Sequence, residues 1–447
     1  MKISCVGGGP AGLYFSILMK RQDPSHDLTV YERDPAGSTY GWGVTYWSGL
    51  LDALHRGDPE TARAIRDASV RWSDGLAHVH GRTTRHHGDE GFGIGRRRLL
   101  GILAERAESL GVRLEFGREV GADEVDGGDA DTGADGPAAA GSVTAGADLV
   151  VAADGVNSVL RGRYAREFGS EVARGRNTYV WLGTTKVFDA FTFAFVPTEH
   201  GWIWCYGYRF DEEHSTFVVE CAPTTWSGLG LDRADEAEGL TLLEKLFAEP
   251  LDGHPLIGRA QPDGAAQWLN FRTLTNRRWH HGNLVLLGDA AHTTHYSIGA
   301  GTTLALEDAI ALADALGDLP PGARATAARG SVAPGAPGST GHLLPGLDAA
   351  LARYERERKA AILSVQSAAR YSARWYENLP RYLRLEPEEM FALLGQRHSP
   401  LLPYVPPRLY YRVDRAVERS EALRTLKRRL GPRIARVLHG RADTKRT

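Results

Sequence analysis

Short apolar runs, each followed by a loop rich in glycine, Asp and hydroxyl side chains, recur along the chain. They cover residues 3–6, 149–153 and 284–287. Strands of a parallel sheet are buried on both faces and therefore appear as continuous apolar runs. Segments of helical composition lie at residues 13–20, 99–110 and 302–316. We predict an α/β domain whose ligand-binding loops lie beyond the carboxyl ends of parallel strands.

The middle of the chain has a different pattern, with strands but no intervening helices. The predicted strands are 179–188, 191–196, 201–210 and 215–221, and such close spacing predicts antiparallel sheet. Aromatic side chains at alternate positions of the third strand share one face: Trp202, Trp204, Tyr206, Tyr208 and Phe210. This face either packs on helices or forms the wall of a pocket for a planar ring. In the second case Trp202, Trp204 and Tyr206 bind the substrate.

The first apolar strand leads into the pattern G-x-G-x-x-G, formed by Gly7, Gly9 and Gly12. A second strand, at residues 28–31, then delivers Glu32. The glycines let the backbone approach a pyrophosphate, whose charge is met by N–H groups at the start of the helix. The acid can accept hydrogen bonds from ribose hydroxyls and disfavours a 2′-phosphate. The motif therefore predicts bound FAD or NAD rather than NADP.

Two further loops add polar groups to the same edge of the sheet. Asp154 ends the second apolar run, and Asp289 follows the third. The helix from Thr302 presents unpaired N–H groups and a partial positive charge to any electron-rich group beside it. Arg96, just before the helix at 99–110, is placed to reach a phosphate oxygen, although Arg96 to Arg98 could equally be a solvated cluster.

Composition and cysteine usage limit the partners. Lys and Arg number 53 against 55 Asp and Glu, so the formal net charge of -2 favours neither nucleic acid nor an anionic membrane. The three cysteines have no C-x-x-C spacing and no neighbouring histidine cluster, which indicates neither a disulfide framework nor a metal site. The chain shows no secretory signal and no apolar run that could span a bilayer. We expect a cytoplasmic protein.

The length of 447 residues suggests about three domains. We expect a dinucleotide-binding domain from 1–71, 92–172 and 272–318, a substrate domain from 72–91 and 173–271, a flexible linker at 319–346 and a helical region at 347–447. The linker is rich in Pro, Gly, Ala and Ser without a period. A flexible acidic loop at 121–148 lies outside the predicted site. A long amphipathic helix is expected at 351–375.

Three motifs together resemble the single-component, or group A, FAD-dependent aromatic hydroxylases, the class typified by p-hydroxybenzoate hydroxylase. They are Gly7-x-Gly9-x-x-Gly12 with Glu32, Ala153-Asp154-Gly155 with Ser158 and Arg161, and Leu287-Gly288-Asp289 with His292. Residues 41–44, 181–193, 199–202 and 295–302 resemble more narrowly the salicyloyl-CoA 5-hydroxylase and 2-aminobenzoyl-CoA monooxygenase branch. Ser297 stands where most of the class carries proline, and that branch shares the replacement.

The resemblance implies a Rossmann-type FAD-binding domain with an inserted antiparallel substrate domain and C-terminal helices. It implies that Glu32 binds ribose, Arg96 the pyrophosphate, Asp289 the ribityl chain, and residues 299–302 the pyrimidine edge of the flavin. The cofactor-binding residues that we predict are Gly7, Gly9, Pro10, Ala11, Gly12, Glu32, Arg33, Gly43, Val44, Arg96, Asp154, Asp289, Gly299, Ala300, Gly301 and Thr302.

The resemblance also implies the reaction. NADH or NADPH binds transiently and reduces FAD, O2 adds to give a C4a-hydroperoxide, and an electron-rich ring takes up its distal oxygen. The implied substrate is an aromatic acyl-CoA, in particular salicyloyl-CoA hydroxylated at C5 to gentisyl-CoA, and the protein is a monomer or homodimer. His295, Tyr296 and Tyr46 are the candidates for a catalytic base, although a His in this loop could equally be structural.

Other functions remain open at this point. The same chemistry suits 2-aminobenzoyl-CoA, a carrier-bound aryl thioester, or an indole or tryptophan-derived biosynthetic intermediate. A flavin halogenase is a rival because Trp202-Ile-Trp204 matches half of the W-x-W-x-I-P signature, but Cys205-Tyr206-Gly207 replaces the rest. A non-catalytic flavoprotein is a second rival, and substrate-stimulated NAD(P)H oxidation discriminates against it.

Overall fold

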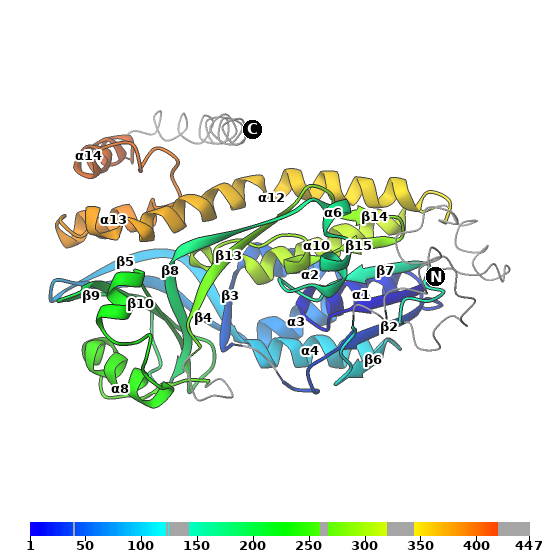
Figure 1. Ribbon diagram of the computed structural model, residues 1–447, viewed down its shortest axis with the longest axis horizontal. Helices are drawn as coiled ribbons and strands as arrows, with labels where there is room; N and C mark the ends of the chain where they lie inside the picture. Colours follow the sequence, from blue (N-terminus) through cyan, green and yellow to red (C-terminus); the bar gives the residue numbers. More distant parts are fainter. Residues whose placement is uncertain (39–40, 122–123, 125–142, 260–266, 320–343, 419–447) are drawn as a thin grey trace.

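The computed structural model describes residues 1–38, 41–121, 124, 143–259, 267–319 and 344–418 (Figure 1). Almost all of the predicted linker, most of the acidic loop and residues 419–447 of the predicted C-terminal helical region lie outside these residues. None of the helices described is both long enough and apolar enough to cross a bilayer.

A six-stranded sheet forms one half of the molecule. Its order is β14 (His280–His281), β15 (Leu284–Leu286), β7 (Leu149–Ala152), β1 (Lys2–Val6), β2 (Asp27–Glu32) and β6 (Arg113–Phe116). The strands from β15 to β6 are parallel, and only the β14–β15 pair is antiparallel. The three apolar runs thus lie side by side as β15, β7 and β1, which confirms the predicted parallel α/β domain.

Helices cover this sheet near the ends of its strands. They are α1 (Pro10–Gln22), α4 (Arg96–Ser109) and α10 (Gly301–Gly317), and α1 packs against both of the others. Each begins one to three residues before the apolar pattern suggested, because the added residues, among them Pro10, Arg96 and Gly301, carry no large apolar side chain. Pro fits the first turn of α1 since it has no N–H to leave unpaired there.

A nine-stranded sheet forms the other half. Its order is β12 (Leu256–Ile257), β8 (Ser170–Thr184), β11 (Ser215–Cys221), β10 (Gly201–Arg209), β9 (Phe191–Thr198), β4 (Val70–Val79), β5 (Arg82–Gly95) and β3 (Gly43–Trp47), and β13 (Leu269–Asn276) also pairs with β8. The strands pair antiparallel except β4 with β9, which are parallel. Residues 43–47 and 92–95 extend this sheet beyond the segments expected to build it.

Strand β8 begins at Ser170, nine residues before the predicted start, and ends at Thr184. Its first half is polar and mostly exposed, so it lacks the hydrophobic signal of a strand. It is a strand because β13 pairs with it from Ser170 to Arg174. This partner lies about a hundred residues further along the chain, where a local pattern cannot reveal it.

One long helix, α12 (Leu347–Glu377), links the two halves, as expected from the amphipathic pattern. It contacts α10, β14, η3 and β8, and in Figure 1 it runs along both halves of the molecule. Further helices are α2 (Ser48–Gly57), α3 (Pro59–Asp67), α5 (Val159–Arg163), α6 (Ala165–Phe168), α7 (Pro223–Gly228), α8 (Glu236–Leu246), α9 (Ala248–Leu251), α13 (Pro387–Gly395) and α14 (Pro407–Glu418), with 3₁₀ turns η2 (Gly288–Ala290), η3 (Tyr296–Ile298) and η4 (Leu379–Arg381).

Both faces of the nine-stranded sheet are packed. The side chains of β11 and β10 that include Phe217 and Ile203 form one core with α8 and α9. The opposite, aromatic face forms a second core with the end of α12 and with α13. There Trp204 stacks on Tyr376 with ring centroids 5.9 Å apart. The aromatic face of β10 is therefore covered by helices over Trp204.

Candidate functional site

The glycine turn after β1 is shaped by close backbone contacts. Gly7 has φ +113°, and a Cβ there would lie 2.2 Å from the carbonyl oxygen of Ala153. A Cβ at Gly12 would lie 2.1 Å from the carbonyl oxygen of Gly7. Gly9, in contrast, faces open space, and as the N-cap of α1 it provides no side-chain cap. The N–H groups at the start of α1 are thus available to an anion in that space.

Glu32 ends β2 and holds this turn from the side. Its Oε2 accepts a hydrogen bond from the N–H of Gly8 at 2.7 Å, and its Oε1 accepts one from the N–H of Asp34 at 2.9 Å. A carboxylate has about four acceptor sites, so two remain for the hydroxyls of a ribose. The neighbouring Arg33 is exposed and lies 3.9 Å from Asp34.

Asp289 lies on η2, directly after the strand β15. Its side chain is exposed, yet burial by the surrounding protein raises the pKa of its carboxyl, an effect that His292 and Arg96 partly offset. A carboxylate that lines an open space inside the protein is accessible to solvent and is at the same time surrounded by protein atoms. Arg96, the first residue of α4, is therefore close enough to influence this carboxyl electrostatically.

Asp154 follows β7 and turns its Oδ2 toward α5, where it accepts the N–H of Val159 at 2.7 Å. Its Oδ1 is buried and has no hydrogen-bond partner among the described residues. Burial raises the pKa of this carboxyl, and hydrogen bonds from Ser158 and Val159 oppose the shift. The adjacent Gly155 faces open space, as Gly9 does.

The start of α10 closes the opposite side of the site. Its N-cap, Ala300, makes no side-chain hydrogen bond, and a Cβ at Gly301 would meet no atom within 4 Å. Gly299 has φ +63°, and a Cβ there would lie 2.6 Å from Oγ1 of Thr45 on β3. The strand β3, which also carries Gly43 and Val44, thus supports this loop from behind. The uncapped helix start can receive an electron-rich group.

These features fit FAD. Two uncapped helix starts, at Gly9 and Gly301, and the loop residue Gly155 face open space, and two carboxylates, Glu32 and Asp289, have acceptor capacity left for hydroxyl groups. A dinucleotide supplies both the anionic pyrophosphate and the hydroxyls that such donors and acceptors require.

A buried network fixes the loop behind Asp289. Nε2 of His292 lies 2.9 Å from Oδ2 of Asp308 on α10, and Trp279 stacks on the imidazole. The other oxygen of Asp308 accepts a hydrogen bond from Nε of Arg358 on α12 at 2.7 Å. The sequence reading missed Arg358, whose only local signal is a cation within the amphipathic helix.

The loop from His295 to Ile298 is held by a second arginine. Arg397 donates to the carbonyl oxygen of Ser297 at 2.8 Å and to Oγ of Ser372 at 3.1 Å. Nδ1 of His295 lies 2.8 Å from Oγ of Ser297. Burial, and secondarily the charge of Arg397, lower the pKa of His295 to about 3. The imidazole is therefore neutral at physiological pH. No sequence pattern indicated Arg397.

Tyr296 points toward the sheet and donates a hydrogen bond from its hydroxyl to Oε2 of Glu220 at 2.5 Å. Glu220 lies on β11, is 2% exposed, and also accepts a hydrogen bond from Nδ2 of Asn177 at 2.7 Å. The ring of Tyr296 packs against Tyr179 and Tyr206, with centroid distances of 4.4 and 6.3 Å. Sequence reasoning missed Glu220, although an acid inside the apolar run of β11 was the available signal.

The other candidate catalytic and substrate residues have separate surroundings. The hydroxyl of Tyr46 lies 2.6 Å from Oγ of Ser69, and its ring stacks on Phe92. His295 and Tyr296 lie together, with ring centroids 4.3 Å apart, whereas the contacts of Tyr46 are with other residues. Trp202 contacts His80 edge to face. Of the three predicted substrate residues, Tyr206 is the one whose ring packs beside Tyr296.

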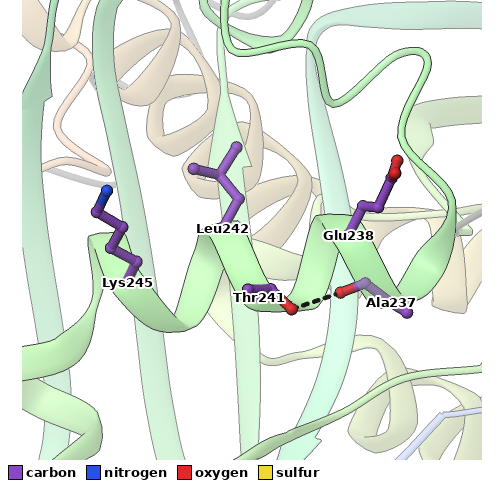
Figure 2. A pocket seen from close by; sticks show the side chains of 5 residues that line it. All are labelled: Ala237, Glu238, Thr241, Leu242 and Lys245. Atoms are coloured by element: carbon purple, nitrogen blue, oxygen red, sulfur yellow. Dashed lines mark hydrogen bonds between the residues drawn. The ribbon is translucent and has the colours of Figure 1, made fainter.

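A shallow depression on the exposed side of α8 shows none of these features (Figure 2). It is lined by Ala237, Glu238, Thr241, Leu242 and Lys245. The Thr241 hydroxyl is used in a hydrogen bond to the carbonyl oxygen of Ala237 at 2.9 Å. All five residues belong to a single helix, so we assign no ligand to this surface. Across the described part of the chain, no three His, Cys, Asp or Glu side chains are grouped to hold a metal ion.

Comparison with known proteins is consistent with this site. A family model described as an FAD binding domain matches residues 1–327. A salicyloyl-CoA 5-hydroxylase from a Streptomyces species is 35% identical over 393 residues, which cover 86% of this chain and 67% of that protein. A 3-hydroxy-4-methyl-anthranilyl-[aryl-carrier protein] 5-monooxygenase from Streptosporangium sibiricum is 32% identical over 380 residues, covering 85% and 90%.

Solved structures share the fold. The tetrameric form of 2-methyl-3-hydroxypyridine-5-carboxylic acid oxygenase has a TM-score of 0.59 at 18% identity and covers 85% of this chain and 91% of that one. PqsL, a probable FAD-dependent monooxygenase from Pseudomonas aeruginosa, has a TM-score of 0.59 at 19% identity and covers 89% and 99%. At such low identity the likeness concerns the fold alone.

Proposed function

The chain belongs to the FAD-binding-domain family of aromatic monooxygenases, and we propose that it hydroxylates salicyloyl-CoA at C5, with NADH or NADPH as reductant and O2 as co-substrate. The observation that carries this proposal is the 35% identity to a salicyloyl-CoA 5-hydroxylase over 393 residues. Bound FAD would activate O2, one atom of which is transferred to the substrate. The residues of the chain bind the cofactor and the substrate, orient them, and exclude water from the site.

We assign the cofactor contacts from the open space described above. The N–H groups at the start of α1 would meet the pyrophosphate, with Arg96 as a further cation. Glu32 would accept the ribose hydroxyls, and Asp289 those of the ribityl chain. The N–H groups at residues 299–302 would donate to the electron-rich edge of the flavin ring and stabilise the negative charge that reduction places there.

The surroundings of Tyr296 favour a neutral aromatic substrate. Tyr179, Tyr206 and Phe271 pack around its ring, so a ligand beside it would lose much of its hydration. A free carboxylate would pay a desolvation penalty in such a place, whereas a thioester is uncharged. An ortho hydroxyl donates electron density to C5, which lies para to it, and electron density is what oxygen transfer to a ring requires.

An aryl thioester on a carrier protein is a second candidate substrate. Its support is the 32% identity to the anthranilyl-carrier monooxygenase over 85% of this chain. That substrate also joins a benzoyl thioester to an electron-donating ortho group, here an amine. 2-Aminobenzoyl-CoA combines features of both and belongs in the same test.

The test compares salicyloyl-CoA, 2-aminobenzoyl-CoA, free salicylate and tryptophan as substrates of the FAD-loaded protein. NAD(P)H oxidation, hydrogen peroxide release and product mass are measured for each. We expect coupled hydroxylation, one oxygen atom added for each NAD(P)H oxidised, with salicyloyl-CoA. Efficient hydroxylation of salicylate or tryptophan, together with only peroxide release from both thioesters, would refute the thioester proposal while leaving the monooxygenase class intact.

A further inference from the structure

Glu220 is a buried acid that the cofactor site does not use. It lies on β11, on the same face of the strand as Val218, which belongs to the aromatic core, and its side chain is almost inaccessible to solvent. The hydrogen bonds that it accepts from Tyr296 and Asn177 come from neutral donors. A carboxylate held in this way retains its charge at a cost that neutral donors only partly offset.

Several elements bring charged or titratable groups toward Glu220. Tyr179 faces it from β8, Tyr206 from β10, Tyr296 from η3, and Tyr376 and Glu377 from α12. Arg397 acts on Tyr376 from beyond α13. Burial raises the pKa of Glu220 to about 7, the hydrogen bonds from Tyr296 and Asn177 oppose the shift, and the charge of Glu377 adds to it. Both protonation states of Glu220 are therefore populated near neutral pH.

Tyr296 connects this acid with the cofactor loop. It stands three residues before Gly299, in the loop that leads into the uncapped start of α10. Its hydroxyl donates a hydrogen bond to Glu220, and its ring packs against those of Tyr179 and His295. The neighbouring His295 is a poor base, because burial lowers its pKa to about 3.

On the basis of the proposed function, we propose that Tyr296 and Glu220 form a proton relay that takes up the proton of the substrate's ring hydroxyl. The substrate O–H and the Tyr296 O–H bonds break, and new O–H bonds form on Tyr296 Oη and on Glu220 Oε2. One negative charge thereby moves from Glu220 to the substrate oxygen, and no electrons are exchanged with another reagent. The phenolate is a stronger donor to C5 than the phenol. When the ring regains aromaticity after hydroxylation, the proton held by Glu220 returns through Tyr296 to the oxygen of the substrate's original ring hydroxyl.

The relay is tested by titrating the bound substrate rather than by turnover alone. Salicyloyl-CoA is added to the oxidised, FAD-loaded protein without reductant, and its phenolate absorbance is followed from about pH 5 to pH 9, a range that spans the Glu220 titration. In Glu220→Gln and Tyr296→Phe, we expect the phenolate absorbance to appear roughly a hundredfold more slowly after mixing at each pH, because the proton of the ring hydroxyl then lacks its path to Glu220. In the same two variants, the low-pH limb of the plot of kcat against pH should shift or disappear.

Glu377→Gln serves as the matched control, because it removes a nearby negative charge but neither hydrogen bond to Glu220. It should move the low-pH limb of the kcat profile to lower pH, since the charge of Glu377 raises the pKa of Glu220. FAD content shows that each variant is folded.

The outcomes separate two failures. If salicyloyl-CoA binds and both relay variants ionise it as the wild type does, the relay is wrong and the proposed function stands. If salicyloyl-CoA does not bind to the wild-type protein, the proposed substrate and the relay built on it are both overturned.

Discussion

Arg358 of α12 and Asp308 of α10 form an ion pair inside the core, with Nε of the arginine 2.7 Å from Oδ1 of the aspartate. The Asp308 side chain is fully buried, and its second oxygen lies 2.9 Å from Nε2 of His292. The loop that carries Asp289 is thus anchored to α12 through a chain of three side chains.

Replacing Asp308 by Asn should strongly destabilise the protein, because it leaves the buried Arg358 with only the partly exposed Glu307 as a counter-charge. Breaking one side of a buried pair typically costs about 3–5 kcal/mol. Urea unfolding of the FAD-free protein measures the loss. Glu307→Gln is the control, since Glu307 pairs with the same guanidinium at 3.2 Å but is partly exposed, and it should cost at most about 1 kcal/mol. Equal losses in the two variants would show that burial does not determine the strength of this pair.

Glu32→Ala and Asp289→Ala should each weaken FAD binding, because each removes a charged acceptor for buried hydroxyl groups. A hydrogen bond to a charged group is worth about 1.5–3 kcal/mol, which corresponds to roughly ten-fold or more in the dissociation constant. Flavin fluorescence on titration measures it. Asp34→Ala provides the comparison, since Asp34 contributes only its backbone N–H to Glu32. Unchanged flavin affinity in all three variants would remove both acids from the site.

Two glycine variants compare a position that lines the proposed cofactor space with a position packed against the backbone of the protein itself. A Cβ at Gly301 would meet no atom within 4 Å, whereas a Cβ at Gly12 would lie 2.1 Å from a backbone oxygen. Gly301→Val should therefore leave the melting temperature of the FAD-free protein nearly unchanged but abolish FAD binding. Gly12→Val should lower soluble yield or melting temperature. Normal FAD content in Gly301→Val would mean that the cofactor does not occupy the space before α10.

Stability should fall in acid through Asp58. Burial raises the pKa of this carboxyl, but hydrogen bonds from Arg106, Thr61 and Arg21 outweigh it and bring the pKa from 3.8 down to about 2. Because the folded-state pKa is the lower one, the carboxylate contributes stability above about pH 4, and this is lost progressively as the pH falls toward 2.

Asp58→Asn should consequently be less stable than wild type at neutral pH, with the difference narrowing toward pH 3. Urea midpoints at several pH values measure this. The exposed Asp67, which pairs with its neighbour Arg66, supplies the control variant Asp67→Asn, whose pH dependence should match the wild type. A gap between Asp58→Asn and wild type that stays constant with pH would contradict the assignment.

The parts of the site that the sequence predicted are built from neighbouring residues. Gly7, Gly12 and Glu32 belong to one strand-turn-helix-strand unit, and the contacts of Gly12 with Gly7 and of Glu32 with Gly8 follow from that local geometry. The contact of Gly7 with the distant Ala153 does not. The fold class, the parallel sheet and the helix starting near Thr302 followed from hydrophobic period for the same reason.

The parts that the sequence missed depend on contacts between distant residues. Glu220 and Tyr296 are 76 positions apart, and Arg397 and Ser297 are 100 apart. A hydrophobic period shows which face of an element is buried, but it does not name the partner. The aromatic face of β10 therefore allowed two interpretations, and only the fold shows that Tyr376 covers Trp204.

The helix α12 is 31 residues long, which corresponds to about 46 Å at 1.5 Å per residue. Arg358 in its first half pairs with Asp308, Ser372 further on contacts Ser297, and Tyr376 near its end stacks on Trp204. One continuous helix thus contacts α10 in the half with the parallel sheet, the loop at residues 295–298 and the aromatic face of the second sheet. The two sheets are for this reason expected to melt as one cooperative unit, so that occupancy by the cofactor in one half raises the melting temperature of the other.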